Sequence, residues 1–160
     1  MTSQSVPRTR GAKLTTRRAK ETDAWAIKDL IDRYVASGTL LPRTLDFIKD
    51  YAHEFIVAVD RDKVIGSVHL DEYAPSLAEL RSLAVDPEYQ GRGVGRLLVQ
   101  ATEKLATARG YHTLFAVSND EEFFKRFGFE KRHIPELDLE RSEVSRFKGV
   151  HAKDLHPSSP

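Results

Sequence analysis

The chain has 160 residues, no cysteine, and 25 basic against 24 acidic side chains, which gives a formal net charge of +1. This length suits one domain that folds without disulfides or metal. The lack of cysteine excludes disulfide scaffolds, cysteine-type zinc sites, iron–sulfur clusters and cysteine nucleophiles. The near-zero net charge argues against a dedicated DNA-binding protein. Apolar runs fall short of the roughly 18 residues of a membrane span, and the sequence shows no signal peptide, so we expect a cytoplasmic protein.

Both ends of the chain are expected to be disordered tails around one folded domain. Residues 1–20 hold six basic residues and no acidic residue. Such a stretch favours a disordered basic tail, placed at 1–12, and leaves a nucleic-acid-binding arm or an organelle transit peptide as alternatives. The Pro- and Ser-rich end at 156–160 is predicted to be a second tail. The domain between the tails is predicted to span 13–155.

The first half of the domain predicts a strand, two helices and three further strands. Thr22 or Asp23 can cap a helix that Gly38 ends, and Thr44 can cap a second, short helix. The apolar side of the first helix is predicted to consist of Ile27, Leu30, Ile31, Tyr34 and Val35. Two β-rich runs joined by a short polar turn predict a hairpin. The predicted strands of this half are 14–18, 53–59, 64–70 and about 77–85.

The second half predicts helices alternating with strands. A long amphipathic helix is expected from about Gly93 to Arg109, and Gly110 supplies its stop. The remaining elements are a strand at 113–117, a helix at about 120–127, a strand at 129–131, and, within 134–155, one short helix and a last strand near 147–153. This order is typical of an α/β sandwich with a mixed sheet. Hairpin-joined strands give its antiparallel part and helix-joined strands its parallel part.

The most informative segment is a glycine-rich loop that leads into the long helix. Gly91, Gly93 and Gly95 would let the backbone turn tightly and approach a ligand closely. The first N–H groups of the helix can bind an anion, and Arg92 and Arg96 would add positive charge, so the loop predicts a phosphate site. The dinucleotide pattern G-x-G-x-x-G fails because Arg96 stands in place of its third glycine, and the G-x-x-x-x-G-K-[ST] pattern is absent.

The loop and both its flanks resemble one enzyme family. The segment Gln90-Gly91-Arg92-Gly93-Val94-Gly95 is similar to the [RQ]-x-x-G-x-[GA] pyrophosphate loop of the GNAT superfamily of N-acetyltransferases. Its lead-in, Leu83-Ala84-Val85-Asp86-Pro87-Glu88-Tyr89, and the later Phe123-Phe124-Lys125-Arg126-Phe127-Gly128-Phe129 resemble the same family. The resemblance covers about 13–155 and implies a GNAT-like mixed β-sheet flanked by helices, a three-layer α/β/α sandwich.

By this resemblance, the co-substrate is acetyl-CoA, which serves as the acetyl donor, and no metal is expected. The loop N–H groups would hold its pyrophosphate. The strand before the loop would splay from its parallel neighbour at 113–117, and the pantetheine arm would pair with the backbones of Leu83 and Val85. A backbone N–H near Val85 would polarise the thioester carbonyl. The expected cofactor-binding residues are Leu83, Ala84, Val85, Gln90, Gly91, Arg92, Gly93, Val94, Gly95, Arg96, Asn119 and Phe124. An alternative role for Asn119 is to cap the helix that follows it.

Acetyl transfer to an amine needs a base, and Glu79 is the candidate. An α-ammonium with a pKa near about 8 is mostly protonated at neutral pH, so a proton must first be removed. Glu79 lies six residues before Val85, where several relatives place a glutamate base; the alternative is a plain ion pair on a sheet face. Phe124 stands where many relatives have a tyrosine acid, which leaves the thiolate's proton donor unassigned. Without cysteine, direct transfer is expected.

The acceptor site of the family lies at the first two helices and the loop between them. Arg43 in that loop could bind a substrate carboxylate as a guanidinium fork, or it could be a solvated charge. Strand alternation places Arg81 on the same face as Glu79, Leu83 and Val85, so Arg81 could help bind the same carboxylate.

A narrower resemblance concerns the acceptor. Gly38-Thr39-Leu40-Leu41-Pro42-Arg43, Glu79-Leu80-Arg81-Ser82-Leu83-Ala84-Val85 and Phe123-Phe124 are similar to the stand-alone, single-domain N-acetylglutamate synthases. This implies transfer to the α-amine of L-glutamate in arginine biosynthesis. Another small amine, amino acid or protein amine is the alternative acceptor, and a non-catalytic acetyl-CoA sensor is the alternative of another class. The expected partner is a small amine, with no nucleic acid and no membrane, and a homodimer is left open.

Overall fold

The computed structural model describes residues 14–135, 137 and 149–156. The predicted tail at 1–12 and most of the predicted tail at 156–160 lie outside the described residues. The same holds for much of 134–155, where a short helix was expected. None of the described helices combines the length and the hydrophobicity needed to cross a membrane.

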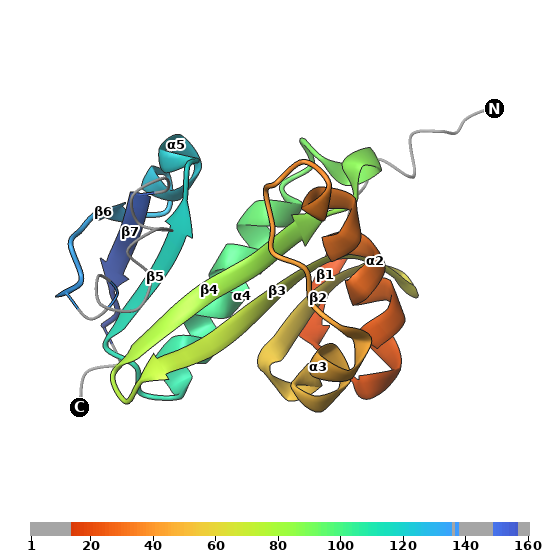
Figure 1. The fold of residues 1–160 in the computed structure, drawn as a ribbon, viewed down its shortest axis with the longest axis horizontal. Coiled ribbons are helices and arrows are strands. Elements are labelled where there is room, and N and C mark those ends of the chain that lie inside the picture. The colour runs from red at the N-terminus through yellow and green to blue at the C-terminus, as the bar shows by residue number, and fades with distance from the viewer. Residues whose placement is uncertain (1–13, 136, 138–148, 157–160) are drawn as a thin grey trace. The chain divides into compact units, whose positions relative to one another are not determined.

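The helices and strands follow the predicted order along the chain (Figure 1). One mixed sheet contains seven strands in the order β1-β2-β3-β4-β5-β7-β6. The pair β4–β5 is parallel, whereas β1–β2, β2–β3, β5–β7 and β6–β7 are antiparallel, which confirms the mixed sheet. The elements are β1 (Leu14–Arg18), α2 (Ala24–Val35), α3 (Leu45–Asp50), β2 (Phe55–Asp60), β3 (Lys63–Ala74), β4 (Leu77–Val85), α4 (Val94–Ala108), β5 (Thr113–Ser118), α5 (Glu121–Lys125), β6 (Glu130–Lys131) and β7 (Gly149–Asp154).

One strand is longer than predicted, because β3 continues to Ala74 and not to Leu70. Two other element boundaries differ from the prediction for local reasons. The strand expected from His53 begins at Phe55, because Ala52–Glu54 form a 3-10 turn in which the Glu54 N–H donates to the Tyr51 carbonyl at 2.8 Å. The helix expected to reach Phe127 ends at Lys125, and Gly128 then takes a left-handed φ of +89° that reverses the chain into β6. Such a φ is accessible to glycine at little cost.

The described residues pack as two compact units. The first unit comprises 14–69 and 82–102, and the second comprises 70–81, 103–135, 137 and 149–156. The elements β3, β4 and α4 each contribute residues to both units. The two units are therefore described separately.

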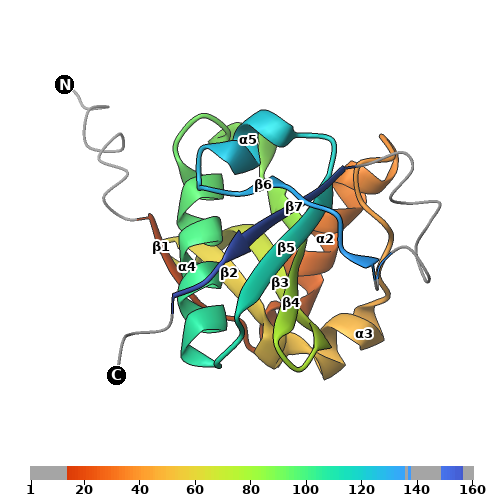
Figure 2. The same ribbon diagram turned by 90° about the vertical axis from the view of Figure 1, so that its left-hand side faces the viewer.

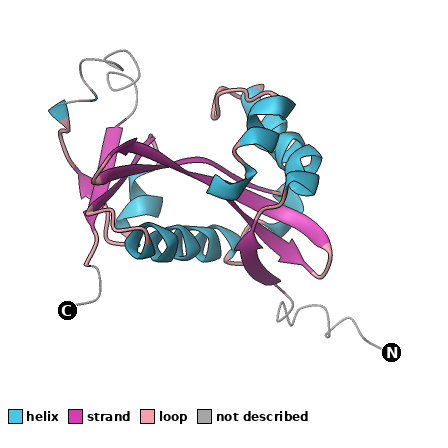
Figure 3. Ribbon diagram, turned by 90° about the horizontal axis from the view of Figure 1, so that it is seen from below, coloured by secondary structure: helices cyan, strands magenta, loops and turns pink. Residues whose placement is uncertain are grey.

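In the first unit, α2 and α3 cover one face of the strands and the beginning of α4 lies against the other (Figures 1 and 3). Paired residues of β2 and β3 share a face, and successive pairs alternate between faces. Val57, opposite Ser67, belongs to the core beneath α2 and α3, while Gly66, opposite Ala58, faces α4. The core on the α2 and α3 side consists of Ala19, Ala24, Ile27, Ile31, Ile48, Phe55, Val57 and Val59.

In the second unit, β5, β7 and β6 lie side by side (Figure 2). The whole of β5 pairs with β7, from Thr113 opposite Asp154 to Ser118 opposite Gly149. Phe115 is fully buried, and the ring of Tyr73 meets it edge-on at a centroid distance of 5.7 Å. This small core also contains Ile134, Leu137 and Ala152.

Candidate active site

The glycine-rich loop has the backbone that the phosphate prediction requires. Gly91 and Gly93 have left-handed φ angles of +81° and +82°, and an added Cβ at either would meet nothing within 4 Å. The two glycines are therefore needed for the turn of the chain, and the backbone stays open to a ligand. Gly95 lies within the first turn of α4 and has no left-handed φ, so it does not form the turn, and its close approach to a ligand stays a prediction.

A buried aspartate fixes the entrance to the loop. Asp86 is 5% exposed, and its carboxylate accepts a hydrogen bond from the Glu88 N–H at 2.9 Å. The guanidinium of Arg33 on α2 lies 3.4 Å from the same carboxylate. The Asp86 N–H donates to the Ile65 carbonyl of β3 at 2.8 Å. The chain thus leaves β4 in one defined direction.

The long helix behind the loop is packed closely on β3. An ideal Cβ on Gly66 would lie 3.0 Å from both Val94 Cγ1 and Leu98 Cδ1, which belong to the first turns of α4. Only glycine lets the helix approach this closely without displacement. The helix N-terminus, with N–H groups that lack intrahelical partners, is therefore held beside the loop, and Arg96 is exposed on its first turn.

Aromatic and charged side chains meet on the loop itself. The Tyr89 hydroxyl donates to Asp60 Oδ2 at 2.7 Å, and this bond raises the pKa of Tyr89, so the phenol keeps its proton. The guanidinium of Arg92 lies over the Tyr89 ring, 4.9 Å from its centroid, in cation–π geometry. Arg92 is thus supported beside the open turn. These residues fit an anionic, phosphate-bearing ligand.

The strand that leads into the loop pairs only partly with its parallel neighbour. The β4–β5 ladder consists of Leu77 with Thr113, Ala78 with Leu114, and Glu79 with Phe115. Leu83 and Val85 belong to no pair of this ladder. Because the Asp86 N–H bonds to β3, the N–H and C=O of the preceding residue, Val85, point away from β3.

Ser82 interrupts β4 at its middle. Its φ is +55°, in the left-handed region that a residue with a side chain enters only at a cost. The predicted alternation, with Glu79, Arg81, Leu83 and Val85 on one face, assumed a regular pleat. The left-handed residue departs from a regular pleat, but buried Leu80, Ser82 and Ala84 still alternate with half-buried Arg81, Leu83 and Val85, as the prediction expects. The left-handed residue stands just before the segment expected to bind the cofactor.

Tyr34 on α2 is a residue of this site that sequence reasoning missed. Its hydroxyl donates to the Val85 carbonyl and accepts a hydrogen bond from Gln90 Nε2 at 2.8 Å. In the sequence it was counted only among the apolar residues of the helix. The one available signal was its hydroxyl, the polar atom on an otherwise apolar helix face.

Two predicted residues of the second unit, Glu79 and Arg81, lie close together. Glu79 is 3% exposed, and its Oε1 lies 3.8 Å from Arg81 Nη1. The same Arg81 nitrogen donates to Asp71 Oδ2 at 2.9 Å. The ion pair weighed as an alternative for Glu79 is therefore present, and it does not exclude the role of a base. Arg81 already has a carboxylate partner, although its guanidinium carries further N–H donors.

Arg43 belongs to the first unit and stands just before α3. Its guanidinium lies 5.3 Å from the centroid of the Phe47 ring and donates to the Pro42 carbonyl at 3.3 Å. Lys28 Nζ on α2 donates to the Arg43 carbonyl at 3.2 Å. The Thr44 hydroxyl accepts from the Phe47 N–H at 3.0 Å and caps α3, as predicted. The residue predicted to hold the acceptor is thus half-buried and well supported.

The segment around α5 corrects one interpretation. Asp120, and not Asn119, caps α5, because Asp120 Oδ1 accepts from the Phe123 N–H at 3.2 Å. Asn119 is exposed, so its predicted contact with the cofactor stays a prediction. Phe124 is 5% exposed, and its ring lies parallel to that of buried His151 at a centroid distance of 6.0 Å.

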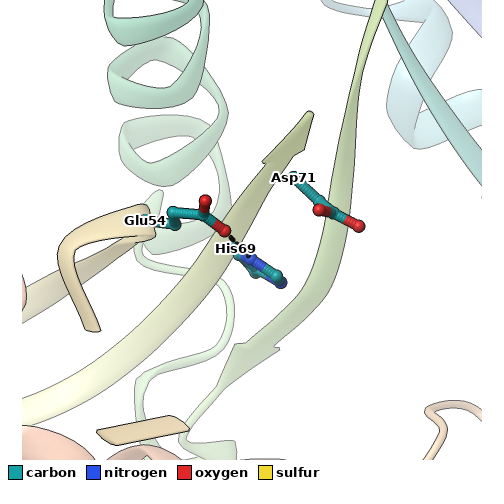
Figure 4. Close-up of side chains that lie close together, drawn as sticks. All are labelled: Glu54, His69 and Asp71. Atoms are coloured by element: carbon teal, nitrogen blue, oxygen red, sulfur yellow. Dashed lines mark hydrogen bonds and ion pairs between the residues drawn. The ribbon is translucent and has the colours of Figure 1, made fainter. Parts of the chain in front are cut away.

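A buried histidine and a glutamate that the sequence did not single out also meet in the first unit. His69 on β3 is 1% exposed, its Nε2 lies 2.9 Å from Glu54 Oε1, and its ring stacks on Phe55 at 4.4 Å (Figure 4). Asp71, drawn in the same view, follows His69 by two positions along β3. The two partners are far apart in the sequence, so no local motif revealed them.

Comparison with known proteins agrees with this geometry. Residues 51–131 match the family described as "Acetyltransferase (GNAT) domain". An uncharacterized N-acetyltransferase of Chlorobaculum tepidum is 36% identical over 123 residues, 75% of this chain and 79% of that protein. An amino-acid acetyltransferase of Mycobacterium tuberculosis is 35% identical over 125 residues, 76% of this chain and 71% of that protein.

Solved structures show the same fold. A crystal structure of a Mycobacterium tuberculosis protein in complex with CoA and NLQ has a TM-score of 0.78 at 28% identity, covering 89% of this chain and 99% of that one. N-acetylglutamate synthase from Neisseria gonorrhoeae, complexed with coenzyme A and N-acetyl-glutamate, has a TM-score of 0.78 at 25% identity, covering 89% of this chain and 35% of that one. The phosphate-type loop, the sheet order and these matches agree, and the chain belongs to the GNAT family of acetyltransferases.

Proposed function

We propose that this acetyltransferase moves an acetyl group from acetyl-CoA to the α-amine of L-glutamate, as the first step of arginine biosynthesis in the cytoplasm. The observation that carries the proposal is the likeness to amino-acid acetyltransferase and to N-acetylglutamate synthase, each over most of this chain. The chain spans about a third of the Neisseria gonorrhoeae enzyme, so that enzyme's activity is carried over only as a proposal.

In this proposal, the glycine-rich loop and α4 bind the cofactor. The N–H groups of the open turn at Gly91 and Gly93 and of the first turn of α4 would hold the pyrophosphate, with Arg92 and Arg96 adding charge. The backbones of Leu83 and Val85 lie outside the β4–β5 ladder and would bind the pantetheine arm. Acetyl-CoA supplies a thioester carbonyl, which an uncharged amine can attack.

The catalytic end depends on Glu79. In the proposal its carboxylate takes a proton from the substrate ammonium, directly or through water, and so frees the nitrogen lone pair. Arg81, 3.8 Å away, would hold the Glu79 carboxylate in position. Tyr89 is not proposed as the proton donor to sulfur, because its hydroxyl already donates a hydrogen bond to Asp60, and this bond raises its pKa. A thiol with a pKa near about 8.5 leaves readily as the thiolate, so a dedicated acid is not required.

The acceptor end depends on two arginines. A glutamate acceptor carries two carboxylates, and a guanidinium fork binds such a group through paired N–H donors. Arg43, held over Phe47 before α3, is proposed to bind one of them. Arg81 is proposed to assist with the donors that Asp71 does not use.

The proposal is tested by assaying release of the CoA thiol with twenty amino acids, simple amines and short peptides. Because the chain has no cysteine, its own side chains give no background with a thiol reagent. We expect turnover with L-glutamate at millimolar concentration. Turnover only with another amine would refute the glutamate assignment. Binding of CoA without turnover of any amine would instead favour a sensor, which Phe124 in place of a tyrosine acid leaves open.

The role of Glu79 is tested with Glu79→Gln, a change that keeps the shape of the side chain. General bases contribute typically about 10²–10⁴-fold, so kcat should fall by that factor while CoA affinity stays unchanged. The matched control is Glu72→Gln, which alters an exposed glutamate of β3. Full turnover by a folded, CoA-binding Glu79→Gln enzyme would remove the assignment.

A further inference from the structure

The last turn of α2 touches the segment proposed to bind CoA. The Tyr34 hydroxyl donates to the Val85 carbonyl and accepts from Gln90 Nε2 at 2.8 Å. These two partners are the end of β4 and the start of the glycine-rich loop. The Val85–Asp86 peptide is thereby held from both sides, because its N–H donates to Ile65 of β3.

The backbone of the same residue anchors the loop that follows α2. Three donors converge on the Tyr34 carbonyl: the Thr39 N–H at 3.1 Å, the Leu40 N–H at 3.2 Å and the Ser37 hydroxyl at 3.1 Å. Gly38, with a φ of +78°, makes this return of the chain achievable. The loop from Ser37 to Arg43 is the one assigned to the acceptor under the proposed function.

A second contact from the same helix turn acts in the same direction. Arg33, next to Tyr34 in the chain, lies 3.4 Å from the carboxylate of buried Asp86 at the loop entrance. Two consecutive residues of α2 thus bind the start of the CoA segment. The end of α2 therefore cannot shift without breaking polar contacts to that segment.

We infer that Tyr34 is a positioning residue that couples the two ligand loops. Its hydroxyl is bonded to Val85 and Gln90, so a change in their positions moves the last turn of α2. The hydrogen bonds to the Tyr34 carbonyl then move residues 37–40 with that turn. A CoA molecule that orders Gln90 and Val85 then also orders the acceptor loop. The inference rests on the proposed function and adds to it that donor and acceptor bind cooperatively, with CoA favouring the acceptor-ready loop.

The expected effect follows from linkage between sites. A ligand can shift the loop only by the difference in its affinity for the two loop states. Coupling between sites in proteins is typically about 5- to 150-fold, and one neutral hydrogen-bonded hydroxyl belongs at the lower end of that range. We therefore expect CoA to slow amide exchange in residues 37–44 by about 3- to 10-fold in the wild type.

The experiment measures hydrogen–deuterium exchange of 37–44 with and without saturating CoA, and CoA binding by calorimetry. Tyr34→Phe removes only the hydroxyl and leaves the carbonyl that anchors the loop. This variant should bind CoA, while the CoA-dependent slowing of exchange falls below about 2-fold. Gln90→Met breaks the same chain of hydrogen bonds at its other end and should also abolish the slowing.

The matched control is Tyr111→Phe. The Tyr111 hydroxyl donates to Glu72 Oε1 at 2.6 Å in the second unit, outside the proposed ligand sites. Removal of this hydroxyl should leave the slowing of exchange in 37–44 at its wild-type value. The control separates loss of the Tyr34 contact from the general effect of deleting a bonded tyrosine hydroxyl.

The outcomes distinguish the inference from the proposed function. If wild type binds CoA and Tyr34→Phe retains the full slowing, the coupling is wrong and the acetyltransferase proposal stands. If wild type binds CoA and residues 37–44 show no slowing, the coupling is also wrong. If wild type fails to bind CoA, the proposed function falls and the inference falls with it. Loss of slowing in Tyr34→Phe and Gln90→Met, and not in Tyr111→Phe, supports the coupling.

Discussion

Replacement of Gly66 by alanine tests whether packing of α4 on β3 sets the phosphate loop. The added Cβ would lie 3.0 Å from Val94 Cγ1 and Leu98 Cδ1 and 3.4 Å from the Ala84 carbonyl. Carbon atoms prefer about 3.5–4.0 Å, so the two side chains must retreat by roughly half an ångström or more. Both are almost fully buried, and protein interiors are close-packed, so the neighbouring atoms leave them little room. The displacement must therefore reach the first turns of α4.

The change in the free energy of unfolding on Gly66→Ala is the sum of two opposing contributions. Overpacking of a filled core costs about 1–3 kcal/mol. Alanine also reduces the freedom of the unfolded chain, which returns about 0.4–1 kcal/mol where the backbone φ suits it, as it does at Gly66. The net loss is about 1–2 kcal/mol. For a chain of this size that lowers the melting temperature by about 3–7 °C.

The assay combines thermal unfolding with calorimetric titration of CoA. A shift of the α4 N-terminus should weaken CoA binding several-fold, because about 1 kcal/mol of lost contact corresponds to roughly five-fold in affinity. The control is Gly110→Ala, at a φ of +86° with nothing within 4 Å of the new Cβ. It should cost about 1 kcal/mol through backbone strain alone and leave CoA affinity unchanged. If Gly66→Ala keeps wild-type melting and wild-type affinity, packing at this contact does not set the loop.

Three further changes test separate contacts. Arg17 donates two hydrogen bonds to Asp23 and holds the pKa of that carboxylate below its ordinary value. The ion pair therefore stabilises the folded protein above about pH 4, and this stabilisation is lost as pH falls through the folded-state pKa of Asp23. Asp23→Asn should therefore cost about 1–2 kcal/mol in urea unfolding at pH 7 and almost nothing near pH 2, whereas an equal cost at both would contradict the ion pair. Tyr89→Phe should lower stability by about 0.5–1.5 kcal/mol through loss of the Asp60 bond without altering the alkaline limb of the kcat–pH profile, and a changed limb would make Tyr89 a candidate acid. Arg43→Ala should raise the KM for the acceptor about 10-fold or more while the Kd for CoA stays the same, and an unchanged KM would remove Arg43 from the acceptor site.

The sequence predicted the fold well because its signals are local. Gly38 and Thr44 mark the ends of their helices through a left-handed turn and a side-chain cap, and both do so in the structure. The glycine-rich loop was found because Gly91 and Gly93 are needed where the backbone turns to the left. Such features depend on one or a few adjacent residues, so they can be read without knowledge of the fold.

What the sequence could not show depends on contacts between distant residues. Tyr34 was assigned to an apolar helix face, because its partners Val85 and Gln90 lie far along the chain. The sequence predicts a regular strand at Ser82, because nothing in its residue type indicates a φ of +55°. A left-handed serine is retained only where the surrounding structure fixes it, and that constraint is tertiary.

The short parallel ladder between β4 and β5 also bears on how the chain folds. To form it, Leu77 must meet Thr113 across the whole of α4, whereas the β2–β3 pair closes a tight turn. Closing the longer loop costs more chain entropy, and the pairing of three residue pairs in this ladder offsets only part of that cost. The antiparallel β5–β7 ladder has six residue pairs and runs along the whole of β5, so it adds more backbone pairing to the second unit than the β4–β5 ladder does. In kinetic terms, we expect substitutions in β7 to change the folding rate of that unit more than substitutions at Leu77 and Ala78 of β4 do.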